Sequence, residues 1–286
     1  VRRLSLMGRM VPTASPDNVY VFPQPPPKGA PREEFTQWLN LPEPADPKLP
    51  TVWLIGDSTV RNGRGNGYDA QFGWGDPFEK YFYPGMTNVV NRAVGGTGAL
   101  TFSAQWANIL PQIKKGDYVL IQFGHNDNGA RGALKGTGEE TEERENATTK
   151  EKETVHTFGW YLRRYIAEIR AKDATPILCT LVPRNSWKDG KVVRATDSHA
   201  DWTRAVAAAE KVPLVDLNEL IARKYDALGQ EAVTALFADK SVHTGWVGAE
   251  LNALTVVEGL RALDPNPLTG HLRPTMGIVA PKPDDI

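Results

Sequence analysis

The sequence contains a single cysteine, no excess of positive charge and no long apolar segment. Cys179 has no second cysteine with which to form an internal disulfide, and the apolar residues at 176–178 predict a buried, unreactive thiol. The 286 residues include 33 Lys and Arg against 34 Asp and Glu, so the chain lacks the basic excess that binds nucleic acids. No apolar run approaches the roughly 20 residues that span a bilayer, so we expect no membrane partner.

Proline, by contrast, is abundant and unevenly distributed. Eleven of the 22 prolines lie between residues 12 and 50, where no apolar periodicity is sustained. Such a segment predicts an extended arm or a semi-rigid linker, which we assign to residues 1–50. A second biased segment, residues 136–153, holds seven Glu against three Lys or Arg and is typical of a solvated surface insertion.

From residue 51 onward, short apolar runs alternate with amphipathic segments. We expect strands at 52–55, 88–91, 118–123, 176–182 and 212–215, and helices at 158–172, 200–210, 217–228 and 246–263. The first run is apolar throughout, as a strand covered on both faces is. Strands that alternate with helices predict a parallel sheet between two helical layers. We therefore expect one three-layer α/β domain over residues 51–265, followed by a tail at 266–286.

Glycine-rich and polar segments follow the predicted strands, where ligands of a doubly wound sheet bind. A serine on a tight turn after a buried strand is a typical acyl-transfer nucleophile, and it needs a histidine, a carboxylate and donors to the oxyanion. Each of these features is weak alone, but together and in chain order they are specific. The segments are Gly56-Asp57-Ser58-Thr59, Gly95-Gly96, Gly124-His125-Asn126-Asp127 and the residues 239–243 ahead of the last helix.

In this order, the four segments resemble the sequence blocks of the SGNH (GDSL) hydrolases, and the resemblance covers residues 52–255. It implies a three-layer α/β/α fold with a flavodoxin-like parallel sheet and a catalytic domain at 51–265. Finer features resemble the rhamnogalacturonan acetylesterase group, carbohydrate esterase family 12. They lie at residues 56–60, 123–127, 136–141, 155–162, 182–185 and 243–244.

The resemblance implies a serine esterase that removes acetyl groups from pectic polysaccharide with no metal or other cofactor. By this resemblance, Ser58 attacks the acetyl carbonyl, and His243 acts as general base and then as general acid toward the sugar oxygen. The backbone amides of Ser58 and Gly96 and the side-chain amide of Asn126 bind the oxyanion. The expected partner is an acetylated polysaccharide or oligosaccharide, and a secreted or periplasmic location follows from that substrate class.

Two positions depart from the pattern of that family. The acid of the family stands three residues before the histidine, but Lys240 occupies this position and Asp239 stands four residues before His243. Because a lysine cannot accept the hydrogen bond of the imidazole, we expect a one-residue bulge that restores Asp239 as the acid. After Gly96 the family often has arginine and serine, whereas this chain has Thr97-Gly98, which leaves the exact substrate open.

Further residues are candidates for binding sugar or for supporting the turns. Trp74, His125, Arg184 and Trp187 offer aromatic faces or planar donors that suit a carbohydrate, although a core or surface position is the alternative for each. Asp57 and Asp127 are expected to organise their turns by accepting backbone amides. The neighbour of the acid, Lys240, is interpreted as a solvated surface charge.

Two other functions stay open at this point. An acetylxylan or broad-specificity carbohydrate acetylesterase needs the same serine, histidine and oxyanion residues. A non-catalytic glycan-binding protein on the same scaffold is suggested only by the displaced acid. The oligomeric state and the acetylated sugar position are not predicted by the sequence.

Overall fold

The computed structural model describes residues 26–27, 30, 32–146 and 149–274, and it divides the chain into two units, Val1–Asn40 and Leu41–Ile286. The described part of the first unit holds one helix, α1 (Arg32–Leu39), inside the segment for which an extended arm is predicted. Glu33 and Glu34 in its first turn interact favourably with the helix dipole. The predicted arm up to residue 25 lies outside the described residues, and residues 41–50 belong to the second unit.

A five-stranded parallel sheet forms the centre of the second unit. Its strands run in the order β2-β1-β3-β6-β9, which is the flavodoxin-like order with a change of direction between β1 and β3. Each strand coincides with a predicted one, and this confirms the fold class. The strands are β1 (Thr51–Gly56), β2 (Asn88–Asn91), β3 (Tyr118–Gln122), β6 (Thr175–Cys179) and β9 (Leu214–Val215).

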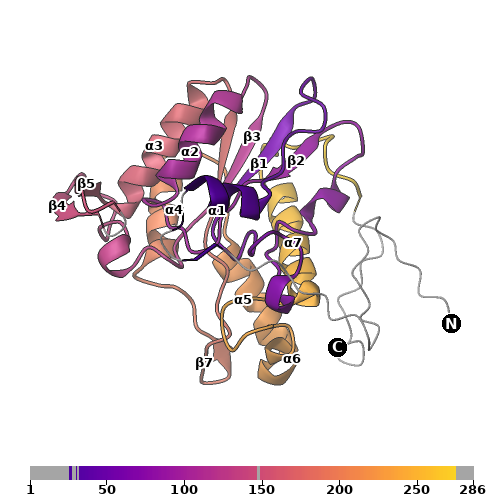
Figure 1. Ribbon diagram of the computed structural model, residues 1–286. Helices are drawn as coiled ribbons and strands as arrows, with labels where there is room; N and C mark the ends of the chain where they lie inside the picture. The colour runs from indigo at the N-terminus through magenta and orange to yellow at the C-terminus, as the bar shows by residue number, and fades with distance from the viewer. Residues whose placement is uncertain (1–25, 28–29, 31, 147–148, 275–286) are drawn as a thin grey trace. The chain divides into compact units, whose positions relative to one another are not determined.

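Helices cover both faces of this sheet (Figure 1). On one side lie α2 (Ser103–Ile109), α3 (Phe158–Arg170) and α4 (His199–Glu210), and on the other lie α5 (Leu217–Leu228) and α7 (Trp246–Arg261). A short helix, α6 (Gln230–Thr234), follows α5. Single 3₁₀ turns occupy Tyr68–Ala70, Phe78–Tyr81, Leu110–Gln112 and Gly129–Arg131.

The side chains of β1 alternate between the two helical layers. Val52 and Leu54 belong to the core cluster that also contains Ile221 of α5 and Val257 of α7. Because successive side chains of a strand point to opposite faces, the buried Trp53 and Ile55 fill the core under α2 and α3. Burial on both faces explains why the run at 52–55 contains no polar residue.

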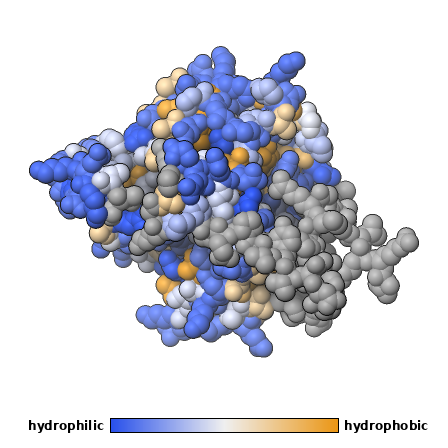
Figure 2. Space-filling model, viewed as in Figure 1, coloured by the Kyte–Doolittle hydropathy of each residue, from blue (hydrophilic) through white to orange (hydrophobic). Residues whose placement is uncertain are grey.

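The acidic segment at 136–153 forms most of an antiparallel hairpin, β4 (Thr141–Glu145) and β5 (Lys152–His156). The side chains of β4 are all at least partly exposed, which agrees with the predicted surface insertion. Figure 1 shows this hairpin projecting beside α3, and Figure 2 shows hydrophilic residues gathered over it. The strand pairing itself was not predicted, because β4 is polar throughout and β5 has a single apolar residue, Val155, so neither shows an alternating apolar pattern.

A second small hairpin joins β7 (Trp187–Lys188) to β8 (Lys191–Val192). Asp189 and Gly190 form its two-residue turn with positive φ angles of 50° and 73°, which is the conformation that Asp-Gly favours. The dipeptide is a hairpin signal in the sequence, but each flanking strand has only two residues, which are too few to show an alternating apolar pattern.

The described part of the predicted C-terminal tail contacts the α/β unit. Leu272 pairs with Phe82, and the backbone N–H of Tyr83 donates a hydrogen bond of 3.1 Å to the carbonyl of His271. Among the helices of the described residues, none has the length and apolar character needed to cross a bilayer.

Candidate active site

Ser58 lies on a tight turn directly after β1. At Gly56 a Cβ atom would lie 2.6 Å from the carbonyl oxygen of Gln122, so glycine allows the turn to pass close to β3. Asp57 is fully buried, and its Oδ1 accepts hydrogen bonds from the backbone N–H (2.8 Å) and the hydroxyl (2.7 Å) of Thr59. Asp57 therefore organises this turn as predicted, and it leaves Ser58 9% exposed.

The structure brings Ser58, His243 and Asp239 together. Oγ of Ser58 lies 2.8 Å from Nε2 of His243, and Nδ1 of His243 lies 2.6 Å from Oδ2 of Asp239. With the ring proton on Nδ1, the imidazole donates to the carboxylate, and Nε2 is left to accept the hydroxyl hydrogen of Ser58. These are the contacts through which a serine hydroxyl can lose its proton to a histidine.

Asp239, and not Lys240, lies against His243. The second oxygen of Asp239 accepts hydrogen bonds from the backbone N–H groups of Ser241, Val242 and His243, at 2.9, 2.7 and 3.0 Å. Partial burial acts to raise the pKa of Asp239, but these amides and the imidazole outweigh it and lower the pKa to about 2. The side chain of Lys240 is exposed, so the extra residue is absorbed in the loop between the acid and the histidine.

The loop that carries His243 is attached to the unit on two sides. The backbone N–H of Ala238 donates to the carbonyl of His243 at 2.9 Å, which closes the loop on itself. Thr244 exchanges hydrogen bonds of 2.9 Å with Phe72, one through its carbonyl and one through its hydroxyl. These hydrogen bonds hold the imidazole of His243, which lies just before α7, next to the serine turn that follows β1.

Gly96 and Asn126 lie on the loops that follow β2 and β3. Gly96 has a φ angle of 76°, and a Cβ atom there would meet nothing within 4 Å, so the backbone conformation rather than space calls for glycine. At the neighbouring Gly95, a Cβ atom would lie 3.4 Å from Cβ of Ser58, which places this loop beside the serine. Nδ2 of Asn126 donates to the carbonyl of Thr97 at 3.1 Å, and its second N–H remains available.

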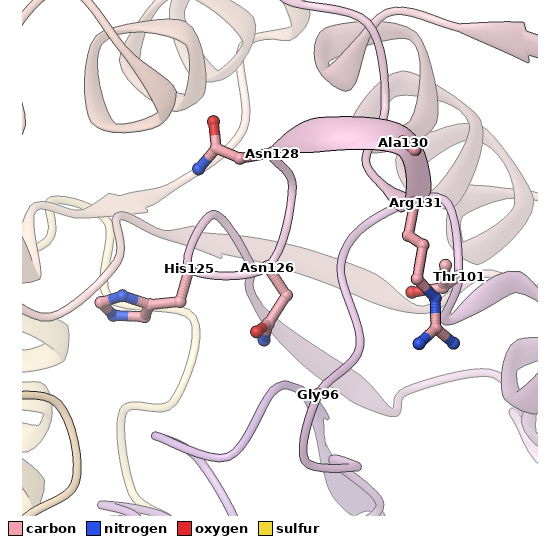
Figure 3. A pocket seen from close by; sticks show the side chains of 7 residues that line it. All are labelled: Gly96, Thr101, His125, Asn126, Asn128, Ala130 and Arg131. Atoms are coloured by element: carbon pink, nitrogen blue, oxygen red, sulfur yellow. The ribbon is translucent and has the colours of Figure 1, made fainter. Parts of the chain in front are cut away.

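Two pockets open beside these residues. The first, of about 460 Å³, is lined by Gly96, Thr101, His125, Asn126, Asn128 and Arg131. Figure 3 shows the side chains of His125 and Arg131 on opposite sides of Asn126. The second pocket, of about 270 Å³, shares His125 and Asn128 with the first and continues along Lys135, Arg184, Asp197 and His199. An extended ligand can thus lie beside Asn126.

A buried polar network beneath the serine turn was missed by sequence reasoning. Nε2 of Gln122 donates to the hydroxyl of Thr59 at 2.7 Å, and Nε1 of Trp74 donates to Oε1 of Gln122 at 2.8 Å. Trp74 is 1% exposed, so its prediction as a sugar contact is wrong: the indole packs in the core and supports the turn. The polar Gln122 inside an otherwise apolar run was the available signal.

The other predicted sugar contacts differ in position. His125 is 9% exposed and lines both pockets, and Arg184 is exposed and lines the second. Trp187 is partly buried, packs against the core and donates from Nε1 to Oδ1 of Asn185 at 2.8 Å. Asn185 in turn donates its backbone N–H to the carbonyl of Ser241 at 2.9 Å, so Trp187 adjoins the loop of the triad acid rather than a pocket.

Asp127 and two buried histidines of the pocket walls, His125 and His199, form a group of titratable side chains. Oδ1 of Asp127 accepts the backbone N–H of Ala99 at 2.7 Å, so the side chain joins the loop after β3 to the loop after β2. Burial raises the pKa of Asp127 to about 7. Burial also lowers the pKa of His125, and it lowers that of His199 to about 4, so both imidazoles are neutral at neutral pH.

The geometry is that of an ester hydrolase, and sequence comparison agrees. The GDSL-like Lipase/Acylhydrolase family matches residues 54–251, a span that includes the serine turn, the loops of Gly96 and Asn126, and His243. The chain belongs to this family. The GDSL-like hydrolase is therefore a carboxylic-ester hydrolase.

Similar proteins have been described in bacteria and fungi. The GDSL-like hydrolase is 30% identical to the rhamnogalacturonan acetylesterase RhgT of Bacillus subtilis, over 77% of this chain and 93% of that protein. It is 28% identical to the rhamnogalacturonan acetylesterase of Emericella nidulans, over 71% of this chain and 81% of that protein. The crystal structure of the Bacillus subtilis protein YxiM matches with a TM-score of 0.62 at 28% identity, over 75% of this chain and 56% of that one.

Proposed function

We propose that this hydrolase removes O-acetyl groups from plant cell-wall polysaccharide, and specifically from rhamnogalacturonan. The arrangement of Ser58, His243 and Asp239 beside a pocket that contains Gly96 and Asn126 carries the proposal. The names of the similar proteins, which are rhamnogalacturonan acetylesterases in a bacterium and a fungus, support the choice of substrate. A secreted or periplasmic location is the corresponding expectation, because the polymer lies outside the cell.

The reaction proceeds in two steps. Oγ of Ser58 attacks the acetyl carbonyl carbon while Nε2 of His243 takes the hydroxyl proton, and the carbonyl oxygen becomes an oxyanion. The amides of Ser58, Gly96 and Asn126 hold this oxyanion, and each well-placed donor contributes roughly 3 kcal/mol. His243 then gives its proton to the departing sugar oxygen, which leaves the acetyl group on Ser58.

Water completes the reaction. His243 removes a proton from a water molecule, whose oxygen attacks the acetyl-serine carbonyl and passes through a second oxyanion in the same site. Collapse of this intermediate returns the proton from His243 to Ser58 and releases acetate. Asp239 keeps the imidazole in the tautomer with the proton on Nδ1 and stabilises the imidazolium formed in each step.

The experiment is an acetate-release assay on acetylated rhamnogalacturonan, acetylated xylan and p-nitrophenyl acetate. We expect the wild-type enzyme to act most efficiently on the pectic polymer, and we expect Ser58→Ala to remove the activity. An equal or higher rate on xylan would favour the broader acetylesterase. Release of acetate that survives Ser58→Ala would contradict the serine mechanism, and absence of turnover on all three substrates would favour a glycan-binding protein.

A further inference from the structure

The two pockets beside Asn126 are adjacent to each other. They share His125 and Asn128, and the first includes both Gly96 and Asn126. The first, of about 460 Å³, lies in the range of roughly 300–1,000 Å³ that is typical of ligand pockets, and the second, of about 270 Å³, lies slightly below it. A glycan whose acetyl group reaches the oxyanion donors therefore has room for neighbouring sugars on both sides of His125.

Positive side chains stand in both pockets. Arg131 lines the first, and Lys135 and Arg184 line the second, where Asp197 is the one acidic side chain among the described lining residues. All three cations are exposed, and none has an ion pair in the described part of the chain. An unpaired guanidinium fits a carboxylate with two parallel hydrogen bonds.

Other cations on the same side of the sheet are paired. Arg163 of α3 contacts Glu139 at 2.5 Å, and Arg144 of the β4–β5 hairpin lies 3.6 Å from Glu153. Two acidic residues of segment 136–153 thus pair with neighbouring arginines, while the three pocket cations have no such partner among the described residues. This local excess occurs although the whole chain has a formal charge of −1.

His125 supplies an independent sign of a ligand at the junction of the pockets. It is 9% exposed, and neither ring nitrogen has a hydrogen-bond partner among the described residues. Buried polar groups normally have partners, so an imidazole at the junction of two pockets, with both nitrogens buried and next to the backbone of Val182, is suited to a polar ligand group that it reaches by a shift of the ring. A neutral imidazole can both donate to and accept from a sugar hydroxyl.

We propose that Arg131 in the first pocket, together with Arg184 and Lys135 in the second, binds carboxylate groups of an acidic glycan and so determines a preference for uronate-containing substrates over neutral ones. This inference rests on the proposed deacetylation of polysaccharide and assigns its specificity to particular residues. These three cations supply the positive charge that an arginine often provides after the oxyanion glycine in the rhamnogalacturonan acetylesterase group, where this chain has Thr97 after Gly96. His125 binds the sugar between the two carboxylate positions.

The test compares one glycan in two forms: acetylated rhamnogalacturonan oligosaccharides, and the same material after chemical reduction of its carboxyl groups to alcohols. For Arg131→Gln and Arg184→Gln, we expect KM for the acidic form to rise by about 5- to 10-fold each, and the effects to multiply in the double variant. KM for the reduced form should change by less than about 2-fold. Lys188→Gln on the β7–β8 hairpin removes an exposed cation outside both pockets and should change neither value.

Binding to the Ser58→Ala protein separates this inference from the proposed reaction. Calorimetric titration with both oligosaccharide forms should give tighter binding of the acidic form, and 0.5 M NaCl should weaken that binding alone. Equal affinity for the two forms, or equal losses on both forms in the arginine variants, would overturn the carboxylate assignment. Failure of the wild-type enzyme to release acetate while the acidic form still binds more tightly would refute the reaction and leave the assignment standing.

Discussion

A single carboxylate, that of Asp239, accepts three backbone amides and one imidazole hydrogen. The amides stabilise the ionised form, and the resulting pKa of about 2 keeps the side chain of Asp239 negative in weakly acidic and neutral solution. The same amides fix the carboxylate through Oδ1, so Oδ2 is held in one direction, toward the ring of His243. The acid can therefore lie four residues before the histidine and still make the required contact.

Asp239→Asn is expected to lower kcat by about 10⁴-fold while the protein stays folded. The asparagine oxygen can still accept the three amides, but its N–H₂ group faces Nδ1 and favours the wrong tautomer of His243. Rates of acetate release and the thermal unfolding temperature are the measurements. Lys240→Ala is the control and should change the rate by less than about 2-fold; the reverse ranking of these two variants would show that the acid is misassigned.

Gly96→Ala should reduce catalysis through the backbone alone. A φ of 76° costs an alanine about 1–2 kcal/mol, while no atom within 4 Å would meet its Cβ, so we expect a folded protein whose amide at position 96 is displaced. A fall in kcat of about 10- to 100-fold on p-nitrophenyl acetate would match the loss of one donor. Gly116→Ala, with a φ of 82° and equally open space ahead of β3, should cost similar stability and leave kcat unchanged; equal kcat in both variants would argue against the oxyanion role.

At the scale of single elements, α3 shows how a side-chain hydroxyl joins a helix to the loop before it. Thr157 caps α3: its buried hydroxyl accepts the backbone N–H of Trp160 at 3.1 Å and donates to the carbonyl of Gly138 at 2.6 Å. The cap thus ties the helix to the segment that leads into the β4–β5 hairpin.

Thr157→Ala should lower the free energy of unfolding by about 2 kcal/mol, because it removes the cap of α3 and one of the two hydrogen bonds to the carbonyl of Gly138, which keeps its bond from Arg163. Thr157→Ser keeps the hydroxyl and should lose only about 1 kcal/mol from the missing methyl group. Urea denaturation of the three proteins measures both values. If serine were as damaging as alanine, packing rather than the hydrogen bonds would explain the loss.

Elements with a clear apolar period were predictable. The five strands and the helices α3, α4, α5 and α7 were found close to their observed bounds, because burial of one or both faces leaves its pattern in the sequence. The strand expected at 176–182 ends at Cys179; the hydroxyl of Thr180 then donates to Asp216, and Leu181 lines the second pocket. Helix α1 and the two hairpins lack such a pattern and were missed.

At the scale of the whole molecule, folding places Asp127 and His199 in a buried environment with opposite effects of pH. Burial raises the pKa of Asp127 to about 7, above its ordinary value of 3.8, so its contribution to stability is complete below about pH 4 and is lost as the pH rises to about 7. Burial lowers the pKa of His199 from 6.5 to about 4, so its contribution is present above pH 6.5 and is lost as the pH falls to about 4.

Asp127→Asn should therefore remove the loss of stability that Asp127 causes as the pH rises from about 4 to about 7. The free energy of unfolding of the wild type, minus that of the variant, should fall by about 4 kcal/mol between pH 4 and pH 8, at roughly 1.4 kcal/mol per pKa unit. Urea titrations at each pH measure the difference, and Asp197→Asn, at an exposed position in the second pocket, serves as the control. Parallel curves for the wild type and Asp127→Asn would mean that Asp127 is ionised in the folded protein throughout.

The sequence by itself determined the parallel α/β architecture and the segments that carry the site, because strand periodicity and tight glycine turns are local properties of the chain. The tertiary structure alone decided which residues meet. Ser58 and His243 are 185 positions apart, and the fit of Asp239 to its ring depends on loop geometry that no spacing rule contains. Burial likewise removed Trp74 from the site, and Arg131 and Arg184 line the pockets with no ion-pair partner in the described part of the chain, because exposure and pairing depend on neighbours that are distant in sequence.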